Sequence, residues 1–160
     1  MKSKIEIVKL LLEYGAKVDQ THKEGFTPLL TAVWNDHPDM VKILLEYGAD
    51  VNNTGNASIT ALLSAMSGDD IDIVKILLRH GADVNKPAKS GEAPIIYAEM
   101  SKKEHFANML IECGAKIPEI LYHKYEPRKN YTHENCINYL DSLERNVTGE
   151  DGVIGEIVKF

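Results

Sequence analysis

Residues 40–52 read MVKILLEYGADVN, and closely related strings lie 33 residues before and 33 residues after them. The earlier string is IVKLLLEYGAKVD over 7–19, and the later one is IVKILLRHGADVN over 73–85. A fourth string, FANMLIECGAKIP over 106–118, keeps the Gly-Ala pair in the same phase. A fixed spacing without insertions is typical of an array of folded repeats.

Each string predicts a short helix that is buried on one side. In residues 40–46 the apolar side chains form a broad face, and the charged side chains point away from it. Gly48 follows where the helix should end, since glycine adopts the left-handed cap conformation without a side-chain penalty. The acidic runs at 36–39 and 69–70 are expected to supply capping carboxylates at the helix starts. Such short helices are unstable alone, so neighbouring repeats must bury their apolar faces.

A second motif recurs in the same phase ahead of these helices. It reads TPLLTA over 27–32, TALLSA over 60–65 and APIIYA over 93–98. Together the two motifs resemble the ankyrin repeat, whose first helix opens with Thr-Pro-Leu-His-x-Ala and whose second helix ends in Leu-Leu-x-x-Gly-Ala-Asp-Val-Asn. The resemblance covers residues 4–117. It implies an all-α solenoid of helix-turn-helix repeats, with β-turn fingers that project from one edge.

The sequence departs from the family pattern near the turns. Apolar residues replace the motif histidine, Ser58 replaces a finger glycine, and charged residues replace the glycine between the two helices of a repeat. The histidine positions hold Leu30, Leu63 and Ile96, and the inter-helix positions hold Asp36, Asp69 and Lys102. We expect somewhat less rigid fingers from these changes and no change of fold.

The register divides the chain into an array, a cap and a tail. The array spans 1–117, with a half repeat over 1–20 and three repeats over 21–53, 54–86 and 87–117. Beyond it, an amphipathic pattern with Thr132 as its cap predicts a helix, and we interpret 118–145 as divergent C-terminal capping helices. For the tail over 146–160, three interpretations stay open: a mobile segment, an extended segment docked on the solenoid and a partner-binding motif.

The half repeat over 1–20 has no first helix and no finger. Its apolar side chains at Ile5, Val8, Leu11 and Leu12 are therefore expected to be partly uncovered, although terminal repeats normally carry a polar outer face. Two explanations stay open. Either the chain is a fragment or a shortened product of a longer array, or another chain covers this end in a homo-oligomer. A monomer is the first expectation.

Composition and charge limit the class of protein. The chain has 160 residues and a net charge of −6, without the clustered basic residues that phosphate binding needs, so no nucleic acid is expected as a ligand. The sequence contains neither a bilayer-spanning apolar run nor a signal peptide. Its two cysteines make no disulfide framework, which fits a reducing compartment. We expect no membrane association and a cytoplasmic location, with delivery into a host cell left open.

Candidate catalytic and metal-binding groups are few. Cys113 occupies a position that holds tyrosine or histidine in other repeats, which indicates a structural cysteine at a surface position, not a nucleophile. A zinc site made of Cys113, His123, His133 and Cys136 would need looser spacings than zinc sites usually show. The sequence carries no phosphate-binding loop and no hydrolase motif. We expect no cofactor, no metal and no enzymatic activity.

The family resemblance implies protein binding and a location for it. In ankyrin arrays, partners usually dock on the concave face formed by the finger tips and the exposed side of each first helix. Transferred to this sequence, that face comprises Lys23, Glu24, Phe26, Trp34, Asn35, Asn56, Ala57, Ile59, Ser67, Gly68, Lys89, Ser90, Glu92, Met100 and Ser101. The resemblance further implies hydroxylation of Asn52 and Asn85 in a host that has an asparaginyl hydroxylase.

Four of these positions, Phe26, Trp34, Ile59 and Met100, carry large apolar side chains where a face without a partner would be polar. Trp34 is the only tryptophan of the chain, and tryptophan is enriched in binding hot spots because one rigid ring buries a large area. We expect a non-enzymatic interaction module that binds a protein or peptide, of unknown identity, around Trp34. Two alternatives stay open. Trp34 folds back onto its helix to fill the core while Phe26 packs under its own finger, or the repeats target a larger multidomain enzyme or effector.

Overall fold

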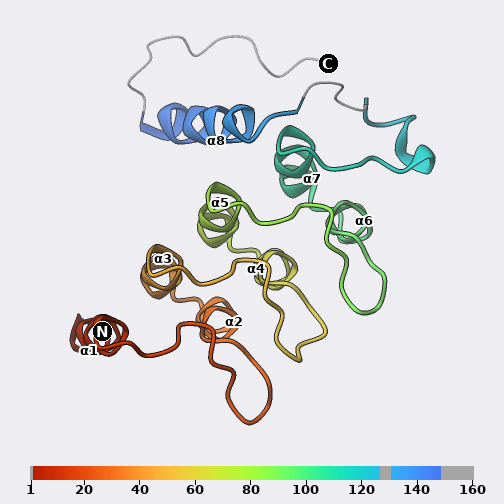
Figure 1. Ribbon diagram of the computed structural model, residues 1–160. Helices are drawn as coiled ribbons and strands as arrows, with labels where there is room; N and C mark the ends of the chain where they lie inside the picture. The colour runs from red at the N-terminus through yellow and green to blue at the C-terminus, as the bar shows by residue number, and fades with distance from the viewer. Residues whose placement is uncertain (1, 127–130, 149–160) are drawn as a thin grey trace.

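The computed structural model describes residues 2–126 and 131–148, which fold into helices and turns without a strand in these two segments (Figure 1). The helices are α1 (Lys2–Glu13), α2 (Pro28–Trp34), α3 (Pro38–Glu46), α4 (Ala61–Gly68), α5 (Ile71–Arg79), α6 (Pro94–Met100), α7 (Glu104–Glu112), the 3₁₀ turn η1 (Glu119–Leu121) and α8 (His133–Thr148). The expected all-α solenoid is confirmed.

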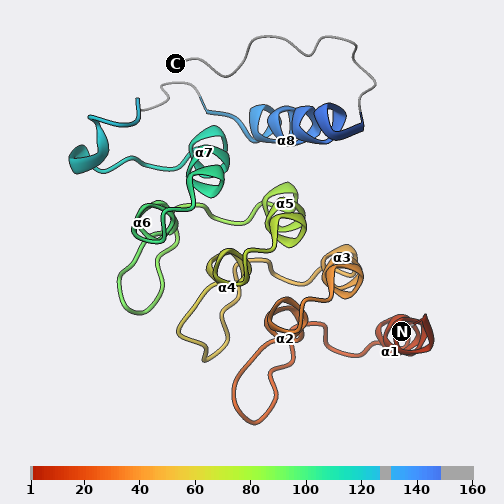
Figure 2. The ribbon, with the colours of Figure 1, turned by 180° about the vertical axis from the view of Figure 1, so that it is seen from behind.

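First and second helices of successive repeats form two rows. Helices α2, α4 and α6 make the first-helix row, and α1, α3, α5 and α7 make the second-helix row (Figures 1 and 2). Long turns project as fingers from the first-helix row. Each first helix packs on the second helix of its own repeat and on the next first helix, as α2 does with α3 and α4. The core therefore extends along the array between the rows.

Core leucines recur in the repeat register. Leu44, Leu77 and Leu110 lie on successive second helices and are at most 3% exposed. Leu11 holds the same position on α1, where no first helix of its own repeat covers it within the described residues, and it is 56% exposed. The expectation of an uncovered half repeat is thus confirmed at Leu11.

The side chains at positions 5, 8 and 12, which were also expected to be partly uncovered, are half-buried. Their partial exposure agrees with the expectation. Ile7, Leu10 and Tyr14 are exposed, because they lie on the opposite side of the helix from the core.

The first helices of two repeats begin with the same threonine cap. The hydroxyl oxygens of Thr27 and Thr60 accept hydrogen bonds from the N–H groups of Leu30 and Leu63, both at 3.1 Å, and both threonines are buried. In the third repeat Ala93 has the same extended backbone, with φ −78° and ψ 150°, but it offers no side-chain acceptor. Helix α6 therefore begins without this cap.

Carboxylate caps were expected at the starts of two second helices, and only one of them is present. An Asp70 carboxylate oxygen accepts a hydrogen bond at 3.0 Å from the first turn of α5 and caps it. One repeat earlier, His37 holds the cap position of α3 without a side-chain bond, so the expected cap there is wrong. Asp36 instead lies in the left-handed turn after α2, and Asp69 and Lys102 adopt the same conformation, with φ of 52°, 63° and 55°. Glycine would adopt this conformation at lower cost.

Asparagine side chains join consecutive repeats. The Asn52 amide donates to the carbonyl of Gly81 at 3.3 Å, and its oxygen accepts from the N–H of Asp83 at 2.8 Å. Asn85 makes the same two bonds to the following repeat, at 3.2 and 2.7 Å. The two asparagines for which the family resemblance implied hydroxylation therefore hold the spacing between repeats.

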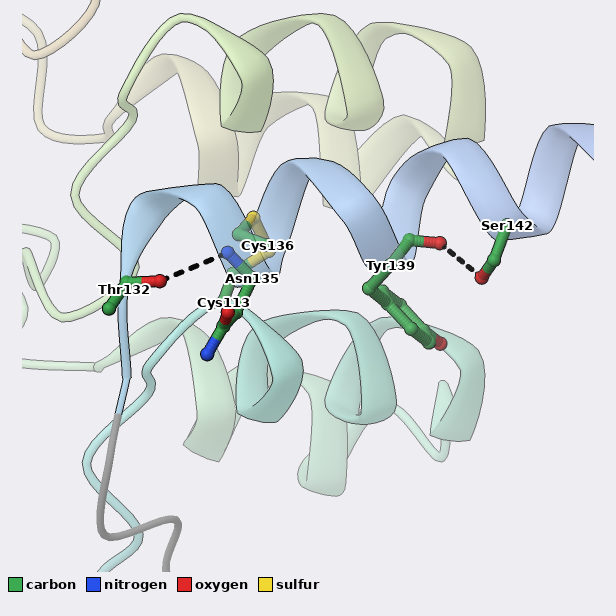
Figure 3. Close-up of a disulfide and its surroundings, with 6 residues drawn as sticks. All are labelled: Cys113, Thr132, Asn135, Cys136, Tyr139 and Ser142. Atoms are coloured by element: carbon green, nitrogen blue, oxygen red, sulfur yellow. Dashed lines mark hydrogen bonds between the residues drawn. A yellow bond between two sulfur atoms is a disulfide. The ribbon is translucent and has the colours of Figure 1, made fainter.

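A disulfide between Cys113 and Cys136 attaches α8 to the array (Figure 3). It joins the end of α7 to the first turn of α8 across 23 residues, with the two Cα atoms 4.5 Å apart. Both cysteines are buried. The expectations of no disulfide and of a surface position for Cys113 are therefore wrong. Helix α8 packs against α5 and α7 and covers a position that stays exposed in the earlier repeats.

Further contacts hold α8 in place. The Arg79 guanidinium of α5 pairs with the carboxylates of Asp141 and Glu144, and Leu140 is fully buried. The Thr132 hydroxyl accepts a hydrogen bond at 3.1 Å from the first turn of α8, which confirms the predicted cap (Figure 3). These contacts support the proposal that 118–145 shields the last repeat.

The C-terminal boundary differs from the expected division of the chain. Helix α8 extends through Thr148, and the remaining residues of the expected tail, 149–160, lie outside the described residues. Over 2–126 and 131–148, no helix combines the length and the apolar character that crossing a membrane requires.

Adding the missing cap should stabilise the third repeat. We expect Ala93→Thr to raise the free energy of unfolding by about 1 kcal/mol, a typical value for a threonine cap, because the backbone already has the capping conformation. Thr60→Ala should lower it by a similar amount. Urea denaturation followed by circular dichroism measures both changes. An Ala93→Thr variant no more stable than the parent would contradict this assignment.

Reduction of the disulfide should destabilise the protein. In the chain-entropy model, closing a loop of this length contributes about 3 kcal/mol, so a phosphine reductant should lower the melting temperature of the parent. The double variant Cys113→Ala/Cys136→Ala is the matched control, and its melting temperature should not respond to the reductant. If the fully reduced parent, shown by thiol titration, melts like the oxidised protein, the stabilising role of the disulfide is refuted.

Candidate functional site

The expected site residues lie along the fingers and the first-helix row. Those exposed are Lys23, Glu24, Trp34, Asn35, Asn56, Ser67, Gly68, Lys89, Ser90, Met100 and Ser101. Phe26, Ile59 and Glu92 are half-buried. Ala57 is buried in the core cluster, so its expected place on the exposed face is wrong.

Trp34 is the last residue of α2, and 67% of its surface is exposed. This exposure excludes the alternative in which Trp34 fills the core. The half-buried Phe26 contacts it edge-on, with ring centroids 5.6 Å apart and the ring planes at 83°, a geometry that the aromatic quadrupoles favour. The His22 ring stacks on Phe26 at 5.5 Å. Two finger residues, His22 and Phe26, thus pack in series against the Trp34 ring.

Two surface hollows meet at Trp34. The inter-repeat hollow, of about 390 Å³, lies between the first two full repeats; its lining includes Trp34, Asp36, Ile59, Ser64, Ser67 and Asp70. The finger hollow, of about 320 Å³, is lined by His22, Glu24, Phe26, Thr31, Trp34 and Asn35. Trp34 is part of both linings, so its side chain borders both hollows.

The structure brings together only part of the expected face. Of the four large apolar side chains, Phe26, Trp34 and Ile59 line these hollows, whereas Met100 lines neither. Farther along the fingers, the Lys89 ammonium donates to the carbonyl of Asn56 at 3.1 Å and so links two neighbouring fingers. The remaining expected residues, Lys23, Ser90, Glu92 and Ser101, line neither hollow.

Sequence reasoning missed two carboxyl groups of the inter-repeat hollow, Asp36 and Asp70. Burial raises the pKa of the Asp70 carboxyl, and its hydrogen bond with Asp36 and the charge of that group raise the pKa further, against the N–H groups at the start of α5. The sequence assigned both residues to helix capping. The repeat register could have revealed this pair, because it places Asp70 of one repeat beside the turn of the preceding repeat that contains Asp36.

The disulfide bears directly on the alternative of a zinc site. Within 2–126 and 131–148, no three His, Cys, Asp or Glu side chains are grouped closely enough to hold a metal ion. The zinc alternative required thiolates from Cys113 and Cys136, which are bonded to each other.

Comparison with protein families assigns the repeats. A family model described as ankyrin repeats (3 copies) matches residues 1–55 and 53–119. The chain belongs to the ankyrin-repeat family. Ankyrin repeats are generally protein–protein interaction modules and are typically non-enzymatic. No curated protein matches the chain.

The carboxyl pair of Asp36 and Asp70 should make the stability of this ankyrin array depend on pH. The folded-state pKa of Asp70 is raised, so the stability penalty of the pair is absent below the unfolded pKa and complete above the folded pKa. Asp70→Asn removes the charge and keeps a good helix cap. We expect its melting temperature to exceed that of the parent at neutral pH, with a difference that shrinks in acid.

The control is Asp72→Asn, in the first turn of the same helix α5 and outside the lining of the inter-repeat hollow. It should not be more stable than the parent at neutral pH. A gain of Asp70→Asn that is equal at neutral and acidic pH would show that the pair is not its cause.

Proposed function

We propose that this ankyrin-repeat array is a non-enzymatic binding module that recognises a protein or an exposed peptide on its fingers and first helices, with Trp34 at the centre of the contact. The observation that carries the proposal is the exposed Trp34 between two hollows. Exposure of a large aromatic ring to water is unfavourable. Interface hot spots are enriched in tryptophan because burial of the ring contributes a large favourable free energy of binding.

The surroundings of Trp34 fit an interface. Phe26 holds the ring edge-on, which lowers the conformational entropy that the side chain would lose on binding. Polar side chains at Glu24, Asn35 and Ser67 lie next to this apolar centre in the two linings. An apolar centre with a polar rim is the usual composition of a protein interface.

Replacing the central ring should weaken binding without unfolding the array. We expect Trp34→Ala to reduce partner affinity by about 2 kcal/mol or more, the hot-spot threshold, and to leave the melting temperature nearly unchanged because the side chain is mostly exposed. The partner, isolated by pull-down from the native source, is titrated by calorimetry against parent and variant.

The matched control is Met100→Ala, which removes another exposed apolar side chain that lines neither hollow. Its affinity should stay close to that of the parent. Full affinity of Trp34→Ala, or a large loss of its stability, would contradict the proposed site. Trp34 fluorescence offers a second readout, since its emission should shift to shorter wavelength when a partner covers the ring.

A further inference from the structure

Two equivalent junctions between repeats carry different charges. In the 33-residue register, Asp36 and Asp70 at the first junction correspond to Asp69 and Lys103 at the second. At the second junction the Lys103 ammonium lies 3.1 Å from the Asp69 carboxylate and donates to the carbonyl of Met66 at 2.7 Å. The chain therefore supplies its own cation to the second junction.

At the first junction the chain supplies a carboxyl group where the second has an ammonium. Asp70 holds the position of Lys103, and its carboxyl group lines the same hollow as that of Asp36. Beside this pair lies the inter-repeat hollow, and none of its lining residues is basic. The Lys103 ammonium lies 3.5 Å from the carbonyl oxygen of the lining residue Ser67, but it is already paired with Asp69. The hollow thus combines an open volume with two carboxyl groups whose charge no lining residue balances.

We propose that the inter-repeat hollow binds a basic side chain of the partner, a lysine or an arginine, whose cation takes the place that the Lys103 ammonium occupies one repeat later. The inference rests on the proposed function and adds the chemistry of the partner. The carboxyl groups of Asp36 and Asp70 attract the cation, and the Trp34 ring adds a cation–π wall. Ile59 offers apolar surface to the methylene stem of the same side chain.

The raised pKa of Asp70 agrees with this arrangement. Two carboxyl groups in contact are unfavourable when both are ionised, and an opposite charge between them favours ionisation. Relief of this repulsion therefore favours binding of a cation, in addition to the direct attraction between opposite charges.

A short peptide pair tests the charge requirement directly. The probes are the blocked pentapeptide Ala-Ala-Lys-Ala-Ala and the same peptide with norleucine, which lacks the ammonium, in place of lysine. The indole N–H resonance of Trp34, the only tryptophan, reports binding by NMR. We expect a saturable shift with the lysine peptide that added salt weakens, and none with norleucine. No saturable shift at millimolar lysine peptide, or equal shifts with both peptides, would overturn the proposal.

Two charge-removing double variants separate this site from general acidity. Asp36→Asn/Asp70→Asn keeps the left-handed turn and the helix cap, since asparagine suits both. It should lower the affinity for the lysine peptide by about tenfold or more. The control Asp39→Asn/Asp72→Asn removes the same charge from two exposed first turns and should bind like the parent. Equal affinities of the two double variants would overturn the inference. If Trp34→Ala still weakened partner binding in that case, the proposed function would stand without this inference.

Discussion

Every helix of the array depends on a neighbouring helix to bury its apolar face. Leu44, Leu77 and Leu110 are almost fully buried, whereas Leu11, at the same position without a first helix beside it, is more than half exposed. Helices of seven to nine residues, such as α2 to α7, are not stable alone in water. The repeat spacing must therefore stay constant, and the hydrogen bonds of the turn asparagines hold it from one repeat to the next.

A backbone that repeats this closely turns sequence differences into local chemical differences. Where Thr60 caps its helix, Ala93 has the same backbone and no acceptor. Where Lys103 balances a carboxylate, Asp70 adds a second carboxyl group beside Trp34. The first difference bears only on stability. The second places two carboxyl groups, and no basic residue, in the lining of the inter-repeat hollow. Comparison of the two junctions therefore separates a difference in packing from a difference in the charge of the proposed site.

The repeat array could be predicted from the sequence because its signals are local and periodic. The place of Trp34 in the repeat favoured an exposed side chain but left a core position open, and the structure decides for exposure. The hollow beside it could not be predicted in full. Asp36 and Asp70 looked like helix caps, and Asp70 does cap α5, but the same side chain also faces the previous repeat. The disulfide was missed for another reason. Periodicity ends before α8, and the burial of Cys136 depends on tertiary packing against α5 and α7.

The stabilising helix α8 and the proposed binding site lie on different sides of the array. Helix α8 and its disulfide lie against α5 and α7 of the second-helix row (Figure 1). The residues that line the hollows around Trp34 belong to the fingers, to α2 and α4, and to the turns after these two helices. Repeats couple mainly to their neighbours, so a change at α8 acts first on α5 and α7. It reaches the inter-repeat hollow through α5, which begins directly after Asp70. The C-terminal helix can therefore stabilise the array while leaving the face around Trp34 open to a partner.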